Sequence, residues 1–552
     1  MNPPRLTEGL KALPAGDKLL LKLCFGAALL ALAVGVVFGA ATAFARAGFI
    51  EMIPLNGYRS MTLHGVNIFF YWLYFAQVGL LLVFGAVSTV KGGRIAWRAL
   101  AWAGLALMFT GFLSSGYAVW SGLPLLYDAP PELAGTPSPA VAAFYLGYLL
   151  LAAGLFCVAV AGVATALRPR FAGRISTWPV VSFASVAWAG LLMVSSVAAV
   201  YAFFPAARWA LGLAPLPAEY STGWHILFHN MHYLPLMATV LVWTVLMETV
   251  SGVKSIFGAR FSKIVFALYL IFVPPTSLYH MFLEPNLAEP VRVIGSLLSL
   301  FISVPTVMVF LVIVASLEAH ARAHGARGLF GWIRMLPWGN PAMAAMGMAV
   351  VNLALGGTFS FVLIQEKIAP LLSDTFFVPG YFHFLTLGTV TLTFLGILCY
   401  IIPAIAGRPL WNPPLLARLP YLVTAGLVFF GGAGIAAGYL GVPRRLLDIA
   451  YSGEAPMLWS TLMNGVGIGG ALMTLALLVY LFALFRTLLP VSPSGESMLP
   501  AVHWKGTAPA VRVWIGPLSI LVLVGAMALF TALAFEMIQA LPFEAAGEPG
   551  GH

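Results

Sequence analysis

Six of the ten histidines lie inside long apolar stretches of the chain, where ionisable side chains are costly and usually functional. Neutral imidazole is a common protein ligand for haem iron, non-haem iron and copper. These residues therefore predict a haem or metal centre, with scattered structural histidines as the alternative interpretation. The six are His64, His225, His229, His232, His280 and His383.

The segments that carry these histidines are predicted to be membrane-spanning helices. Hydrophobic residues make up 61% of the 552-residue chain, charged residues make up 8%, and the mean hydropathy is +0.96. So few charges exclude a soluble protein, and a membrane β-barrel would alternate apolar and polar residues. Since about 20 apolar residues cross a bilayer as a helix, we predict an all-α polytopic membrane bundle of about 13 transmembrane helices. The predicted spans are 18–46, 61–90, 97–121, 139–167, 177–204, 221–250, 262–283, 289–318, 341–365, 378–407, 416–440, 456–487 and 512–540.

Loop charges orient the predicted bundle. Lysine and arginine gather in alternate loops and acidic residues in the others, so the positive-inside rule places the N-terminus in the cytoplasm and the C-terminus outside. We expect one transmembrane domain over 1–552, with a cytoplasmic N-terminal segment at 1–17 and a cytoplasmic loop at 488–511 before the last helix. The net charge of +10 is scattered through short loops, which indicates contact with lipid and not with nucleic acid.

This orientation brings histidines from four spans to one level of the membrane. His64 and His280 lie near the outer ends of their spans, and His383 lies near the outer start of another. His229 lies a few turns into the sixth span, roughly 12 Å deep at 1.5 Å per residue. Unrelated buried histidines would not share a depth, so we expect these four to surround a common centre near the outer leaflet.

With these histidines in place, the chain resembles subunit I of the haem-copper oxidase superfamily, and most closely the B-type oxidases. The resemblance runs over nearly the whole chain and includes the number of spans. The stretches that carry it are Thr62-Leu63-His64-Gly65, His229-Asn230-Met231-His232-Tyr233, Tyr279-His280, Leu329-Phe330-Gly331-Trp332-Ile333-Arg334 with Leu336-Pro337-Trp338, Val378-Pro379-Gly380-Tyr381-Phe382-His383, and Val442-Pro443-Arg444-Arg445.

The resemblance implies a role for each of these motifs in a bacterial or archaeal cytoplasmic membrane. His64 and His383 would be the axial ligands of a low-spin haem, of b type, and a second, high-spin haem would lie nearby. Arg444 and Arg445 would bind the haem propionates, which accounts for two arginines on the outer side. The second metal, iron or copper, would be held by His229 and His280, and Tyr233 would be the active-site tyrosine.

Three positions depart from the family pattern. Tyr279 replaces a histidine that binds the second metal, Tyr381 replaces the proximal histidine of the high-spin haem, and Asn230 replaces a proline. Since tyrosinate can bind haem iron, Tyr381 is a candidate axial ligand of the high-spin haem. Tyr279 and His232 are further candidate ligands of the second metal, and Asn230 is a further candidate active-site residue.

Imidazoles combined with oxygen donors suit iron better than copper(I), and iron beside a haem is the arrangement of nitric oxide reductases in this superfamily. We therefore rank reduction of NO to N2O first. Reduction of O2 to water by a cytochrome c or quinol oxidase is the alternative, followed by a degenerate member that keeps only the low-spin haem. A secondary transporter is the hypothesis from a different class. Electrons would come from a smaller subunit, a soluble cytochrome or copper protein, or quinol.

Overall fold

The computed structural model describes residues 6–88, 93–121, 126–127, 131–216, 220–274, 303–363, 368–447, 453–491, 494–495 and 499–500, with the side chains of 54, 132–133, 220–232 and 370 excluded. The described chain is helical, as expected for segments that must satisfy every backbone polar group internally. The helices are α1 (Leu6–Lys11), α2 (Ala15–Arg46), α3 (Pro54–Gly65), η1 (Val66–Trp72), α4 (Leu73–Val87), α5 (Arg98–Trp120), η2 (Pro131–Ala134), α6 (Pro139–Phe171), α7 (Val180–Ala210), α8 (Tyr220–Ser251), α9 (Gly258–Phe272), α11 (Ser303–Ala323), η4 (Ile333–Met335), α12 (Pro341–Leu363), α13 (Ala369–Leu372), α14 (Phe377–His383), η5 (Phe384–Thr391), α15 (Leu392–Ala406), α16 (Pro413–Leu416), α17 (Leu419–Tyr439) and α18 (Met457–Leu488).

Eleven helices in the described part of the chain are long and apolar enough to cross a membrane, and they coincide with eleven of the predicted spans. The predicted polytopic bundle is therefore confirmed. The predicted span 262–283 begins in α9 and continues into residues outside the description. The predicted span 512–540 and most of the predicted loop 488–511 also lie outside the described residues.

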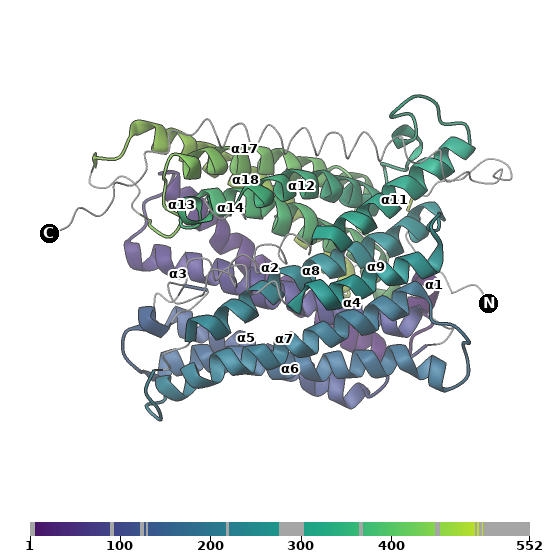
Figure 1. The fold of residues 1–552 in the computed structure, drawn as a ribbon, viewed down its shortest axis with the longest axis horizontal. Helices are drawn as coiled ribbons and strands as arrows, with labels where there is room; N and C mark the ends of the chain where they lie inside the picture. The colour runs from purple at the N-terminus through teal and green to yellow at the C-terminus, as the bar shows by residue number, and fades with distance from the viewer. Residues whose placement is uncertain are drawn as a thin grey trace.

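The long helices run side by side (Figure 1), with α5, α6 and α7 packed together along one edge and α17 against α18 along the other. Between these edges, α3, η1 and α4 form one continuous apolar span over Leu55–Val87. In its 18-residue apolar stretch, 89% of the residues are buried. A second continuous span, made of α14, η5 and α15, covers Phe377–Ala406. In its 18-residue apolar stretch, 78% of the residues are buried. These two central spans carry His64 and His383.

Both central spans change from α-helical to π-helical hydrogen bonding directly after their histidine. The π-helix η1 begins two residues after His64, and the π-helix η5 begins immediately after His383. π-Helical turns are rare and often mark functional sites, because they rotate the following residues relative to an α-helical register. The indole of Trp72, at the end of η1, donates a 3.0 Å hydrogen bond to the hydroxyl of Thr391, at the end of η5.

Candidate functional site

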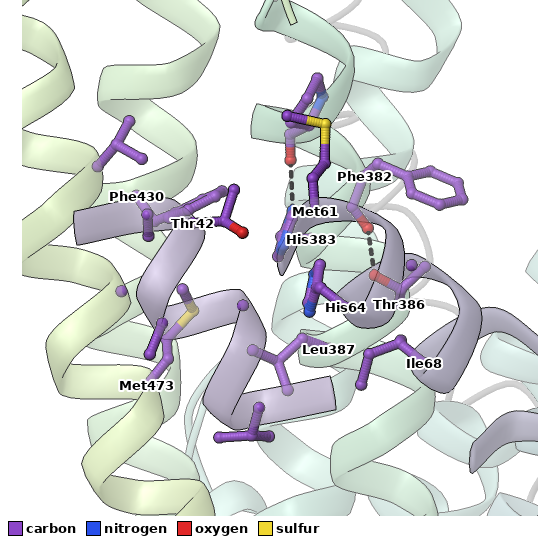
Figure 2. A pocket seen from close by; sticks show the side chains of 18 of the residues that line it. Thr42, Met61, His64, Ile68, Phe382, His383, Thr386, Leu387, Phe430 and Met473 are labelled. Atoms are coloured by element: carbon purple, nitrogen blue, oxygen red, sulfur yellow. Dashed lines mark hydrogen bonds between the residues drawn. The ribbon is translucent and has the colours of Figure 1, made fainter. Parts of the chain in front are cut away.

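His64 and His383 face one cavity of about 210 Å³ in the centre of the bundle. Figure 2 shows the two imidazoles next to each other, with side chains of α2, α3, η5, α17 and α18 around them. Most of the lining is aliphatic, aromatic or thioether in character, as a flat apolar macrocycle would require. Apolar lining residues include Leu32, Val36, Met61, Ile68, Phe69, Phe382, Leu387, Phe430, Val466, Met473 and Leu477.

The two imidazole rings lie next to each other with parallel planes. Their centroids are 6.1 Å apart and their planes differ by 6°. A metal–imidazole bond is about 2.0–2.1 Å long and the ring centre lies about 1 Å beyond the nitrogen, so two imidazoles on opposite sides of one metal have centres roughly 6 Å apart. The observed spacing therefore fits a single iron atom between the rings of His64 and His383.

Backbone carbonyls set the tautomer of both rings. Nδ1 of His64 lies 2.8 Å from the carbonyl oxygen of Gly35, and Nδ1 of His383 lies 2.7 Å from that of Pro379. Because a carbonyl oxygen only accepts, Nδ1 is the protonated nitrogen in each ring and Nε2 keeps its lone pair. This hydrogen bond is typical of metal-binding histidines, since it fixes the ring and makes the other nitrogen a better ligand.

A glycine on α2 gives His64 its space. A Cβ atom at Gly39 would lie 2.5 Å from Nδ1 of His64, which no side chain tolerates. The ring of Phe430, on α17, packs against the ring of His383, with 4.4 Å between the two centroids. The two imidazoles are thus held by packing as well as by hydrogen bonds.

Arg444 and Arg445, which the resemblance assigns to the haem propionates, line the same cavity. Arg444 forms a 3.0 Å ion pair with Asp374, whose side chain is 81% exposed. The backbones join as well, since the Arg444 amide donates to the Asp374 carbonyl oxygen at 3.0 Å. The loop that carries both arginines is therefore attached to the segment leading into α14 and His383.

Arg46 is a residue that sequence reasoning missed. It ends α2, is only 4% exposed and lines the cavity with the other two arginines. Its guanidinium donates to the carbonyl oxygens of Pro443 at 2.6 Å, Arg444 at 3.1 Å and Leu446. It also lies 4.7 Å from the centre of the Phe376 ring, within range of a cation–π interaction. The available signal was an arginine at the outer end of a long apolar run, against the positive-inside rule.

Tyr381 packs in a different cluster from the one that surrounds the histidine pair. Tyr381 precedes His383 by two residues, roughly 200° around the helix, and is 7% exposed in a separate cluster with Leu372 and Phe377. Its hydroxyl is within electrostatic range of Tyr233 on α8 and of Arg444.

The remaining predicted site residues lie outside the described side chains. These residues are His229, Asn230, His232, Tyr279 and His280. Within the part of the chain that the structure describes, no three His, Cys, Asp or Glu side chains form a metal-binding group. The predicted second-metal site therefore stays a prediction.

A protein-family model described as cytochrome C and quinol oxidase polypeptide I matches residues 20–472, most of the chain. The chain belongs to this family. It is therefore a subunit I of the haem-copper oxidase superfamily and a multi-pass membrane protein. Membership of the family implies a low-spin haem, a high-spin haem and a second metal, and it confirms the resemblance found in the sequence at the level of the superfamily.

Relatives of this oxidase subunit extend over most of its length. Cytochrome c oxidase subunit 1 of Thermus thermophilus is 28% identical over 489 residues, 83% of this chain and 83% of the relative. Cytochrome c oxidase polypeptide 1 of Halobacterium salinarum is 24% identical over 410 residues, 69% of this chain and 61% of the relative. A solved heme-copper terminal oxidase dimer shares the fold with a TM-score of 0.77 at 21% identity, covering 95% of this chain and 92% of that one.

These relatives bear on the order of the predicted functions. The two related sequences are named as cytochrome c oxidases, and the comparisons give no support to a nitric oxide reductase branch. The first-ranked prediction, NO reduction, rested mainly on the chemistry of Tyr279 and Tyr381. The alternative, an O2-reducing oxidase, is the better supported of the two.

Proposed function

We propose that this subunit I reduces O2 to water in a respiratory membrane, and that electrons reach the reaction site through a low-spin haem between His64 and His383. The observation that carries the proposal is the pair of parallel imidazoles, 6.1 Å apart, within a chain of the oxidase family. The names of the relatives support O2 as the gas.

A haem with two imidazole ligands supplies one-electron transfer and has no open position for a gas. His64 and His383 offer Nε2 on both sides because Gly35 and Pro379 accept their Nδ1 protons. Each histidine also precedes a π-helix, and the Trp72–Thr391 hydrogen bond ties the ends of the two π-helices together. The residues thus keep the two ligand atoms in place while the charge between them changes.

The arginines at the edge of the cavity would bind the propionates of that haem. Arg444 and Arg445 line the cavity from the loop after α17, and their guanidinium groups suit carboxylates. The ion pair with Asp374 holds Arg444 in position. A positive charge near the haem also favours its reduced state, because the added electron is negative.

For the reaction site we propose His229 and His280 as ligands of the second metal, with His232 and Tyr279 as further candidates and copper or iron as the metal. Tyr381 is the proposed axial ligand of the high-spin haem. Tyr233 would donate a proton to the reacting oxygen, and Asn230 is a further candidate active-site residue. The electrostatic interaction between Tyr233 and Tyr381 is consistent with both lying near one site.

Reduction of NO is the second candidate function. It is favoured by one specific observation, the tyrosines at positions 279 and 381, where the family pattern has histidines. Oxygen donors would favour a second iron over copper. Either reaction needs an electron donor, which we propose to be a smaller partner subunit, a soluble cytochrome or copper protein, or quinol.

The deciding experiment measures haem and metal content per chain in the purified complex and compares turnover on O2 and on NO with the same reductant. The proposal expects two haems and one second metal per chain, with complete reduction of O2 to water. Turnover of NO alone would reverse the order of the two functions. A single haem per chain without turnover would identify a degenerate member of the family.

A further inference from the structure

A second cavity, of about 660 Å³, lies between α6 and α7, beside the turn that precedes α5. It shares no lining residue with the cavity of the histidine pair. Its lining is apolar except for one arginine, Arg168, near the end of α6. Among the described lining residues no acidic side chain is present. We propose that this α6–α7 groove binds an anionic phospholipid, with an acyl chain between the helices and the phosphate on Arg168.

The first argument is charge. Arg94 and Arg98 lie close along the chain to the lining residue Trp97, and Arg170 and Arg174 follow Arg168. Basic pockets between membrane helices at a positively charged surface attract anionic headgroups. An uncharged apolar ligand would fit the apolar walls but would not use Arg168.

The second argument is the backbone of Trp97. Its φ of 46° and ψ of 45° place it in the left-handed region, which is a rare conformation for a bulky residue. Its side chain is nevertheless 64% exposed and forms part of the groove. Strained residues of this kind persist where the surroundings fix them, and they are frequent at ligand sites.

Two buried hydrogen bonds before Trp97 and one ion pair after it hold the residue in that conformation. The amide of Ile95 donates to the Asp17 carboxylate at 2.9 Å, and the amide of Ala96 donates to the Thr165 hydroxyl at 3.0 Å. Arg98 pairs with Asp17 at 3.5 Å. The indole is therefore presented beside α6 at the end of the span, the level at which tryptophan meets lipid headgroups.

The test uses native mass spectrometry of the purified complex, washed free of lipid and then titrated with phosphatidylglycerol or phosphatidylcholine. Phosphatidylglycerol should bind more tightly, and Arg168→Gln should weaken its binding about fivefold without affecting phosphatidylcholine. Arg170→Gln, on the same helix but outside the groove, is the matched control: it removes the same surface charge and should weaken binding clearly less than Arg168→Gln.

Two further variants separate the groove from general surface charge. Ala164→Trp fills the groove without changing its charge and should abolish binding. Trp97→Gly accepts the left-handed backbone and removes the indole, and it should weaken binding while the haem spectrum stays unchanged. Equal binding of both lipids, an unaffected Arg168→Gln variant, an equal loss in Arg170→Gln, or displacement of the phospholipid by a short-chain quinone would each overturn the proposal.

Discussion

The indole nitrogen of Trp72 lies 3.0 Å from the hydroxyl of Thr391, and this hydrogen bond connects the two π-helices that follow His64 and His383. The two candidate haem ligands come from segments more than 300 positions apart in the sequence. Their relative position is therefore set by contacts between the spans, and the Trp72–Thr391 hydrogen bond is a direct polar link between them.

Replacing Trp72 with Phe should loosen this link. Loss of one buried hydrogen bond should lower the free energy of unfolding of the complex by about 1 kcal/mol. It should also broaden the spectroscopic signal of the low-spin haem. The matched control is Trp243→Phe, which removes a 2.8 Å hydrogen bond to Thr393 between α8 and α15. For Trp243→Phe we expect a similar loss of stability and an unchanged low-spin haem signal. Identical spectra for the two variants would contradict the proposed role of Trp72.

Replacing His64 or His383 with Ala should eliminate the low-spin haem absorption, because each removes one of the two proposed ligands. The measurement is the optical spectrum of the reduced complex, together with haem content per chain. His320→Ala on α11, away from the cavity, should leave the spectrum unchanged. If either central variant retains a normal low-spin band, the axial assignment is wrong.

Gly39→Ala should have a similar effect without touching a ligand. The new Cβ would lie 2.5 Å from Nδ1 of His64, so the ring must move away from its carbonyl partner. We expect a shifted or lost low-spin signal. Gly116→Ala is the control, because a Cβ at Gly116 would meet no atom within 4 Å. A normal spectrum in Gly39→Ala would mean that His64 does not occupy the described position.

Arg46→Gln should lower both stability and the reduction potential of the low-spin haem. The variant loses hydrogen bonds from a charged donor to three loop carbonyls, at a cost of about 1.5–3 kcal/mol for each strong one. Arg46→Lys keeps the charge but not the forked geometry, so the potential should recover more than the stability. Redox titration and thermal denaturation measure the two effects separately. An equal potential in all three proteins would limit Arg46 to a structural role.

Tyr381→Phe tests the proposed axial ligand of the high-spin haem. If tyrosinate binds that haem, its charge-transfer band should disappear and its electron paramagnetic resonance signal should change, while the low-spin signal stays normal. Tyr381→His places the family's usual ligand type at this position and should restore high-spin ligation. An unaltered charge-transfer band in Tyr381→Phe argues against ligation by Tyr381.

Hydropathy was sufficient to predict eleven described spans, because a bilayer demands about 20 apolar residues wherever a helix crosses it. The pairing of His64 with His383 was predictable from their shared depth and from the family resemblance. The π-helices were not, since a change of hydrogen-bond register leaves no trace in an apolar pattern. Arg46 and the left-handed Trp97 were missed because their meaning depends on distant partners, the 443–446 loop and the Asp17 and Thr165 side chains.

The atoms that orient both imidazoles belong to the main chain. Gly35 and Pro379 contribute carbonyl oxygens, which every amino acid possesses, so the acceptor stays in place as long as the helix persists and a new side chain has room. Room is short at Gly35, where a Cβ would lie 2.5 Å from the Ile68 side chain. The geometry of this pair is accordingly buffered against sequence drift around it, and mutational damage should concentrate on the ligands themselves and on the few positions where added bulk would push them.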